Sequence, residues 1–149
     1  MSNTYLYLLI ALLAGAMMPT QAATNNKMAA FVDSPILAAL VSFAVGTVAL
    51  LVYALATGVP LGNLAEVKNA PPIAWVGGLL GAFFVTSAVI LVPRLGVAMT
   101  FSVLIAGQMI VTLVIDHFGL LGIEQRPVSW YRLAGIALIT GGVILIRKF

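Results

Sequence analysis

The stretch GGLLGAFFVTSAVILVPRLGVAMTFSVLIAGQ, residues 77–108, decides the fold of this chain. Its only interruption is Pro-Arg-Leu-Gly at residues 93–96, where proline disfavours helix at the residue before it, arginine is costly in hydrocarbon and glycine permits a tight turn. The uncharged runs 73–92 and 95–115 hold 20 and 21 residues, and about 20 suffice to cross a bilayer core roughly 30 Å thick. The stretch therefore predicts a hairpin of two membrane-spanning helices, against which the rest of the chain must pack.

The composition of the 149-residue chain also indicates a membrane protein. Hydrophobic residues make up 62% and charged residues 7%, whereas soluble domains carry about 25% charged residues. The net charge of +3 would hint at nucleic acid in a soluble protein. Here the charges lie between or at the ends of apolar runs, so we expect the lipid bilayer, and no nucleic acid, as the chain's surroundings. The chain has no cysteine, which excludes disulfides, a thiol nucleophile and a thiolate metal site.

We predict an all-α polytopic membrane protein in which residues 1–149 form a single transmembrane domain. The last span is the least secure by length, because only fourteen residues separate Arg132 from Arg147. Four spans and a surface helix are therefore the alternative to five spans. The five predicted helices cover roughly residues 4–23, 35–56, 72–92, 95–116 and 130–147.

The first predicted helix has a second interpretation, a cleaved signal peptide, because Thr-Gln-Ala-Ala at residues 20–23 offers a small-residue cleavage site. No Lys or Arg precedes the apolar run, which favours a retained helix. Polar residues then predict a short connection over residues 24–34. Ser34 is expected to cap the second helix, and Pro35 to begin it.

An odd number of spans places the two ends of the chain on opposite sides of the membrane. The predicted loops carry three positive charges on one side and four on the other, which is almost no positive-inside bias. Either one orientation still wins, or the chain inserts both ways and two copies pair head to tail, as inverted repeats do within larger transporters. The charges are Lys68, Arg126 and Arg132 on the side of the N-terminus, and Lys27, Arg94, Arg147 and Lys148 on the other.

Uncharged polar residues are the candidates for a substrate path, because no charged residue lies in the middle of a predicted span. Gln21 and Asn25 are four residues apart and share a helix face. Gln108, Thr112 and Asp116 follow the same spacing on the fourth helix. An amide that faces lipid would stay unpaired, so both stripes should face protein or water. They either line a cavity for a substrate or form hydrogen bonds between helices.

Asp116 and His117 are the candidates for a proton-linked step, since an unperturbed histidine titrates near pH 6.5. The alternative is that they simply mark a solvated helix end. The chain has no Ser, His and Asp constellation, a single His and no phosphate-binding loop. We therefore expect no catalytic residue, no metal, no cofactor and no enzymatic activity.

Small residues predict where helices approach closely. Gly77 and Gly81 make a Gly-x-x-x-Gly step on the third helix, and Gly135, Gly141 and Gly142 lie on small faces of the fifth. These faces serve packing within one subunit or the seam of a dimer. The fifth helix, which comes last and follows the longest loop, is the better candidate for the seam.

Several of these features together resemble the YdcZ-type branch of the drug/metabolite transporter superfamily. The matching residues include Gln21 with Asn25, Ser34-Pro35 before Ser42-Phe43, the run from Trp75 to Phe83, Val92-Pro93-Arg94-Leu95-Gly96, Ala106-Gly107-Gln108 and Asp116-His117-Phe118-Gly119. The resemblance implies a five-helix unit equal to half of a ten-helix transporter, located in the bacterial inner membrane and acting as an exporter, in pairs. Unlike the four-helix multidrug relatives, this chain has no Glu in its first helix, so their proton-exchange mechanism does not carry over.

From the resemblance and the polar stripes we expect a multi-pass secondary transporter that exports small metabolites or drug-like molecules by alternating access. It would act as a homodimer, antiparallel or otherwise symmetric, with an unidentified small molecule as substrate. The alternative is a membrane scaffold or accessory subunit that transports nothing. The near absence of soluble loops in this chain weighs against that alternative.

Overall fold

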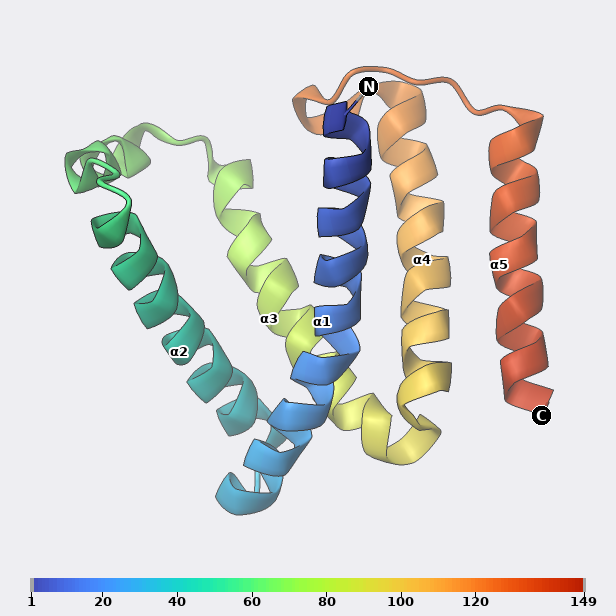
Figure 1. The fold of residues 1–149 in the computed structure, drawn as a ribbon, viewed down its shortest axis with the longest axis horizontal. Helices are drawn as coiled ribbons and strands as arrows, with labels where there is room; N and C mark the ends of the chain where they lie inside the picture. Colours follow the sequence, from blue (N-terminus) through green and yellow to red (C-terminus); the bar gives the residue numbers. More distant parts are fainter. Residues whose placement is uncertain (1, 149) are drawn as a thin grey trace. The chain divides into compact units, whose positions relative to one another are not determined.

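A computed structural model of the chain describes residues 2–148. These residues form five α-helices and two short 3-10 helices, and they contain no β-strand. Each of the five α-helices is long and apolar enough to cross a membrane, so the predicted all-α architecture with five candidate spans is confirmed. The elements are α1 (Ser2–Val32), α2 (Pro35–Ala56), η1 (Leu61–Asn69), α3 (Pro72–Leu95), α4 (Val97–Phe118), η2 (Leu120–Gly122) and α5 (Trp130–Lys148), as Figure 1 shows.

The first helix is longer than predicted, because the expected connection over residues 24–34 is helical as far as Val32. Its 31 residues span about 46 Å at 1.5 Å per residue, more than the hydrocarbon core. The polar residues do not break the helix, since Thr24 Oγ1 donates to Gln21 O (2.9 Å) and Asn26 Nδ2 donates to Ala22 O (2.9 Å). The helix ends only at Asp33, which has a positive φ of 50°.

The third helix also continues past its predicted end. Pro93 lies inside α3, which runs to Leu95. The expected four-residue elbow is therefore reduced to Gly96, whose φ of 79° strains any residue with a Cβ atom. A proline near the C-terminal end of a helix removes only one backbone donor, and the last turn tolerates that loss.

The chain divides into two compact units, one up to Pro93 and one from Arg94 onward. In the first unit α1 packs against α2 near their connection, and Figure 1 shows the two helices diverging from there. The buried apolar residues of these helices are small, namely Ala22, Ala38 and Ala39. Small residues let helix backbones approach closely, which is a main source of helix association in lipid. The single transmembrane domain over the whole chain stays a prediction.

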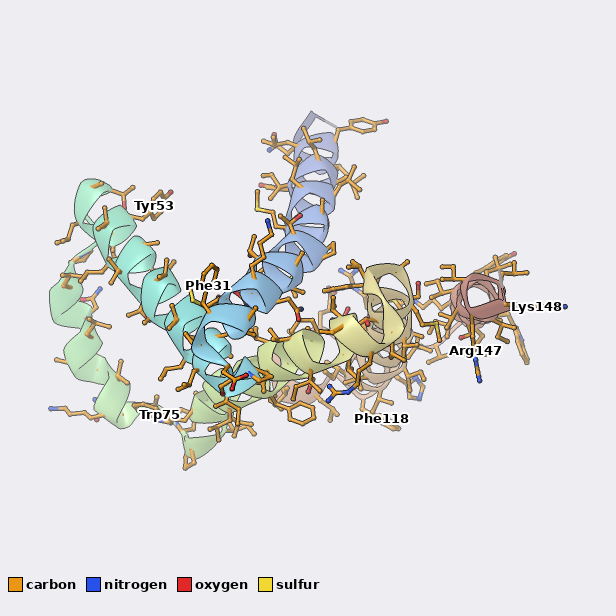
Figure 2. All side chains as sticks on the ribbon, turned by 90° about the horizontal axis from the view of Figure 1, so that it is seen from below. Phe31, Tyr53, Trp75, Phe118, Arg147 and Lys148 are labelled. Atoms are coloured by element: carbon orange, nitrogen blue, oxygen red, sulfur yellow. The ribbon has the colours of Figure 1, made fainter. Side chains whose placement is uncertain are left out.

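In the second unit α4 packs along α5, and the two helices run side by side in Figure 1. Ser129 caps α5, since its Oγ accepts from the backbone N of Arg132 at 3.4 Å. The predicted fifth helix is thus present over 19 residues, about 28 Å, which nearly equals the bilayer core. Arg147 and Lys148 lie at its C-terminal end (Figure 2).

Large apolar side chains cover the outer surfaces of both units. Phe31, Tyr53, Trp75 and Phe118 are all exposed and point away from their helices (Figure 2). In water such a surface would aggregate, whereas in lipid it needs no further cover. The exposure of these side chains therefore fits a protein whose solvent is the bilayer.

Candidate functional site

A groove between α1 and α2 brings together five polar side chains of the first unit, namely Gln21, Thr24, Asn25, Ser42 and Thr47. Gln21 and Asn25, which the sequence placed on one helix face, both lie on the wall that α1 gives to this groove. Its larger hollow has a volume of about 260 Å³. The hollow is lined by Gln21, Thr24, Asn25 and Met28 of α1 and by Ala38, Val41, Ser42 and Val45 of α2.

A second hollow, of about 230 Å³, continues the groove along α2. Gln21 and Ser42 line both hollows, so these two side chains stand where one hollow meets the other. The remaining lining residues of the second hollow are Phe43, Gly46, Thr47 and Leu50. The two hollows together are called the α1–α2 groove below.

Asn25 is the one side chain of the α1–α2 groove that is both polar and buried. It is 7% exposed, and its Nδ2 atom has no hydrogen-bond partner among the described residues. By contrast, Thr24 and Thr47 donate to carbonyls of their own helices, at 2.9 and 2.8 Å. A buried amide donor without a partner costs about 1–3 kcal/mol. Such a group needs an explanation, and a ligand that supplies the acceptor is one.

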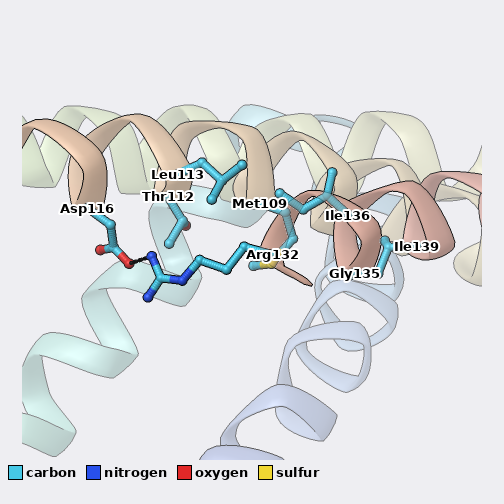
Figure 3. Close-up of a pocket in the computed structure, with 8 residues that line it drawn as sticks. All are labelled: Met109, Thr112, Leu113, Asp116, Arg132, Gly135, Ile136 and Ile139. Atoms are coloured by element: carbon cyan, nitrogen blue, oxygen red, sulfur yellow. Dashed lines mark hydrogen bonds and ion pairs between the residues drawn. The ribbon is translucent and has the colours of Figure 1, made fainter. Parts of the chain in front are cut away.

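The second unit holds a different cavity, of about 250 Å³, between α4 and α5. Figure 3 shows the ion pair at its edge, in which Arg132 Nη1 lies 3.2 Å from Asp116 Oδ2. Thr112 lies one turn before Asp116 and lines the same cavity, but its hydroxyl donates to Gln108 O at 2.8 Å. The other lining residues are apolar, namely Met109, Leu113, Gly135, Ile136 and Ile139.

Asp116 and His117 bind the connection between α4 and α5 rather than each other. The backbone N of Arg126 donates to Asp116 O at 2.7 Å, and Arg132 Nη1 donates to Arg126 O at 3.3 Å. The backbone N of Val128 donates to His117 Nδ1 at 3.3 Å. Because Nδ1 accepts this bond, neutral His117 carries its proton on Nε2. These contacts fix the loop to the end of α4.

Gln108 has a different environment from the rest of its stripe. Its side chain is exposed, and it does not line the cavity that Thr112 and Asp116 share. An exposed amide in the middle of an apolar helix would be unpaired in lipid. The predicted path residues therefore lie in three places: Gln21 and Asn25 line the α1–α2 groove, Thr112 lines the α4–α5 cavity, and Gln108 lies on an open face of α4.

The glycines predicted to mediate packing fall into two groups. A Cβ atom on Gly81 would lie 3.4 Å from the Phe43 ring of α2, so Gly81 allows α3 to approach that ring. No atom of the described residues lies within 4 Å of a Cβ built on Gly77 or on Gly135, Gly141 and Gly142 of α5. The glycines of α5 thus leave space that the other residues of the second unit do not fill.

Sequence reasoning missed two residues. Arg132 was counted only among the loop charges, yet it pairs with Asp116. The signal was an acid and a base at the facing ends of consecutive helices. Ser42 was not a candidate, although it lines both hollows. It is one turn beyond Ala38, which is fully buried against this region. Within residues 2–148 no cluster of three or more His, Asp or Glu side chains could hold a metal ion.

Comparison with known families identifies a match. The family described as "Putative inner membrane exporter, YdcZ" matches residues 6–145, which is nearly the whole chain. No curated protein and no solved structure matches the chain.

Proposed function

Because the chain belongs to the YdcZ family of inner membrane exporters, we propose that it is a secondary transporter that moves small, neutral molecules out of the bacterial cytoplasm by alternating access. Gln21 and Asn25 bind the solute in the α1–α2 groove, and Gln108 and Thr112 belong to the same path. The five-helix chain acts as a homodimer, with the two copies antiparallel or otherwise symmetric. The substrates are small metabolites or drug-like molecules.

The observation that carries this proposal is the unpartnered Nδ2 atom of Asn25 in a groove that also holds Gln21. If these amides served only to hold α1 against α2, Asn25 would be expected to bond across the interface. It makes no such bond among the described residues, and the hollow beside it has space for a small molecule. A buried donor without a protein partner, next to a hollow large enough for a small molecule, is the arrangement expected of a binding site.

The exposed amide of Gln108 supports the dimer. In lipid each unpaired amide costs several kcal/mol, so a second copy or a water-filled passage has to cover it. The open glycine face of α5 offers a close-packing surface for that copy. We expect Gly141→Leu, on a side of α5 turned away from the α4–α5 cavity, to reduce the cross-linked dimer in membranes, whereas Gly77→Leu, on α3 and equally open, should leave it unchanged. Loss of dimer in both variants would contradict the assignment of the seam to α5.

Asp116 and His117 are the candidates for a proton-linked step within this proposal. A proton on the Asp116 carboxylate removes the charge that binds Arg132 at 3.2 Å. A proton on His117 Nδ1 removes the acceptor that Val128 uses. Either protonation weakens a contact that holds the connection between α4 and α5, so it would allow this connection to move.

Transport by the purified chain is the test that separates an exporter from a scaffold. Liposomes loaded with a low-molecular-weight metabolite extract should lose specific solutes when they contain the protein and retain them when they do not. Mass spectrometry of the released fraction identifies the solutes. The variant carrying both Gln21→Leu and Gln108→Leu should release them more slowly. If no solute leaves the wild-type liposomes, the chain is a scaffold or accessory subunit and the proposal is wrong.

A further inference from the structure

We infer that the α1–α2 groove recognises an uncharged ligand through one hydrogen-bond acceptor, a carbonyl or ether oxygen, which accepts a hydrogen bond from Nδ2 of Asn25. This inference rests on the proposed function, and it adds the chemical class of the solute and the atom that selects it. The ligand has an apolar body that fills the hollow and a single acceptor oxygen directed at α1.

The side chain of Asn25 selects for an acceptor because of what surrounds it. Its Nδ2 atom is a donor that is buried and unpaired. No acceptor of the described residues forms a hydrogen bond with it, so the acceptor oxygen of a ligand would be its partner. A ligand without an acceptor would leave the donor unpaired, so the groove discriminates against it.

The walls of the groove exclude charge. None of the residues that line the two hollows carries a charged side chain, and an ion in such a site would lose its hydration without gaining a counter-charge. Lys27 follows Asn25 by two residues but does not line either hollow. A carboxylate or an ammonium group is therefore a poor ligand here.

The remaining lining residues set the shape of the ligand. Met28, Val41 and Val45 give the larger hollow an apolar wall, and methionine adapts to ligands of irregular shape. Gln21 and Ser42 line both hollows and make no side-chain hydrogen bond within residues 2–148. Their side chains can therefore form a hydrogen bond with a polar group of the ligand in either hollow.

Three probes that share one ring test the inference directly. Acetophenone carries a neutral carbonyl, ethylbenzene has no acceptor, and benzoate is an anion. The protein, labelled with ¹⁵N in its asparagine side chains and held in nanodiscs, is titrated with each probe. We expect acetophenone to shift the Asn25 amide resonance. Ethylbenzene controls for partition of the probe into lipid. We expect the apparent affinities of ethylbenzene and of benzoate to be roughly 5- to 150-fold weaker than that of acetophenone.

Asn26→Leu is the matched control for Asn25→Leu, because Asn26 is the adjacent amide and has its partner in Ala22. Asn25→Leu should remove the preference for acetophenone over ethylbenzene, and Asn26→Leu should keep it. The wild-type titration does not depend on either variant folding. An unshifted Asn25 resonance with acetophenone, or a stronger response to benzoate, overturns the inference. Either result can occur while wild-type liposomes still release solute, so it is distinct from a failure of the proposed function.

Discussion

Replacing Asn25 with leucine should make the protein more stable while it disables solute binding. Leucine has the same number of side-chain heavy atoms as asparagine and has no donor to satisfy. The replacement therefore removes a buried amide whose Nδ2 atom has no partner, which relieves about 1–3 kcal/mol. A residue kept at a cost in stability is typical of a functional site.

The same replacement one residue later should have the opposite sign. Asn26 Nδ2 donates to Ala22 O at 2.9 Å, and a hydrogen bond of this kind contributes about 0.5–1.5 kcal/mol. Asn26→Leu is thus expected to destabilise slightly or to be neutral. The difference between the two variants should be about 1.5–4.5 kcal/mol.

Unfolding of each purified variant by dodecyl sulfate, followed by circular dichroism, measures this difference. Both variants must first show the wild-type helix content, so that a misfolded sample is recognised. The reasoning is refuted if Asn25→Leu loses as much stability as Asn26→Leu. That outcome would mean that the Asn25 amide has a protein partner in the membrane and is not held in reserve for a solute.

Three further predictions concern other parts of the chain. Asp116→Asn and Arg132→Gln should each destabilise the protein by about 1 kcal/mol or less, because the ion pair is partly exposed. A double-mutant cycle in the same unfolding assay should give a coupling energy of that size, so the two effects should not be additive. Gly81→Leu should cost about 1–3 kcal/mol by pressing on the Phe43 ring, whereas Gly77→Leu, with open space around it, should cost far less in the same assay. Reporters fused to the C-terminus, each active on one side of the membrane only, should both give signal if the chain inserts in two orientations, and a signal from one reporter alone would rule out the head-to-tail pair.

The helices could be predicted because lipid leaves few alternatives. A run of about 20 apolar residues without charge has to satisfy its backbone internally, and helix is the form that does so within one segment. The residues from 73 to 115 therefore reveal their structure without any knowledge of their neighbours. The same argument identified α5, although only fourteen residues lie between its arginines.

The boundaries of the helices are harder to predict from the sequence, because polar residues such as those at 24–26 also occur where helices end. Asn25 and Asn26 lie well inside α1, and Asn26 is bonded to a carbonyl four residues earlier. Polar side chains end a helix only when they compete with its backbone bonds, and here they add to them. The true end at Asp33 precedes Ser34-Pro35, where the proline restricts the residue before it.

The candidate site was predictable only in part. Spacing alone puts Gln21 and Asn25 on one face, because a helix repeats every 3.6 residues. It does not reveal that Asn25 is buried and unpaired while Gln108 is exposed, since these depend on which helix lies opposite. The pairing of Asp116 with Arg132 has the same origin, because it requires the loop after α4 to fold back onto that helix's last turn.

Release of solute from liposomes that contain either Asn25→Leu or Asn26→Leu tests the central claim most directly. The solutes that leave wild-type liposomes are measured by mass spectrometry over time at equal protein content. The account predicts that Asn25→Leu releases them markedly more slowly and that Asn26→Leu releases them at the wild-type rate. Equal release by the two variants would contradict the claim that the Asn25 amide is held for the transported molecule.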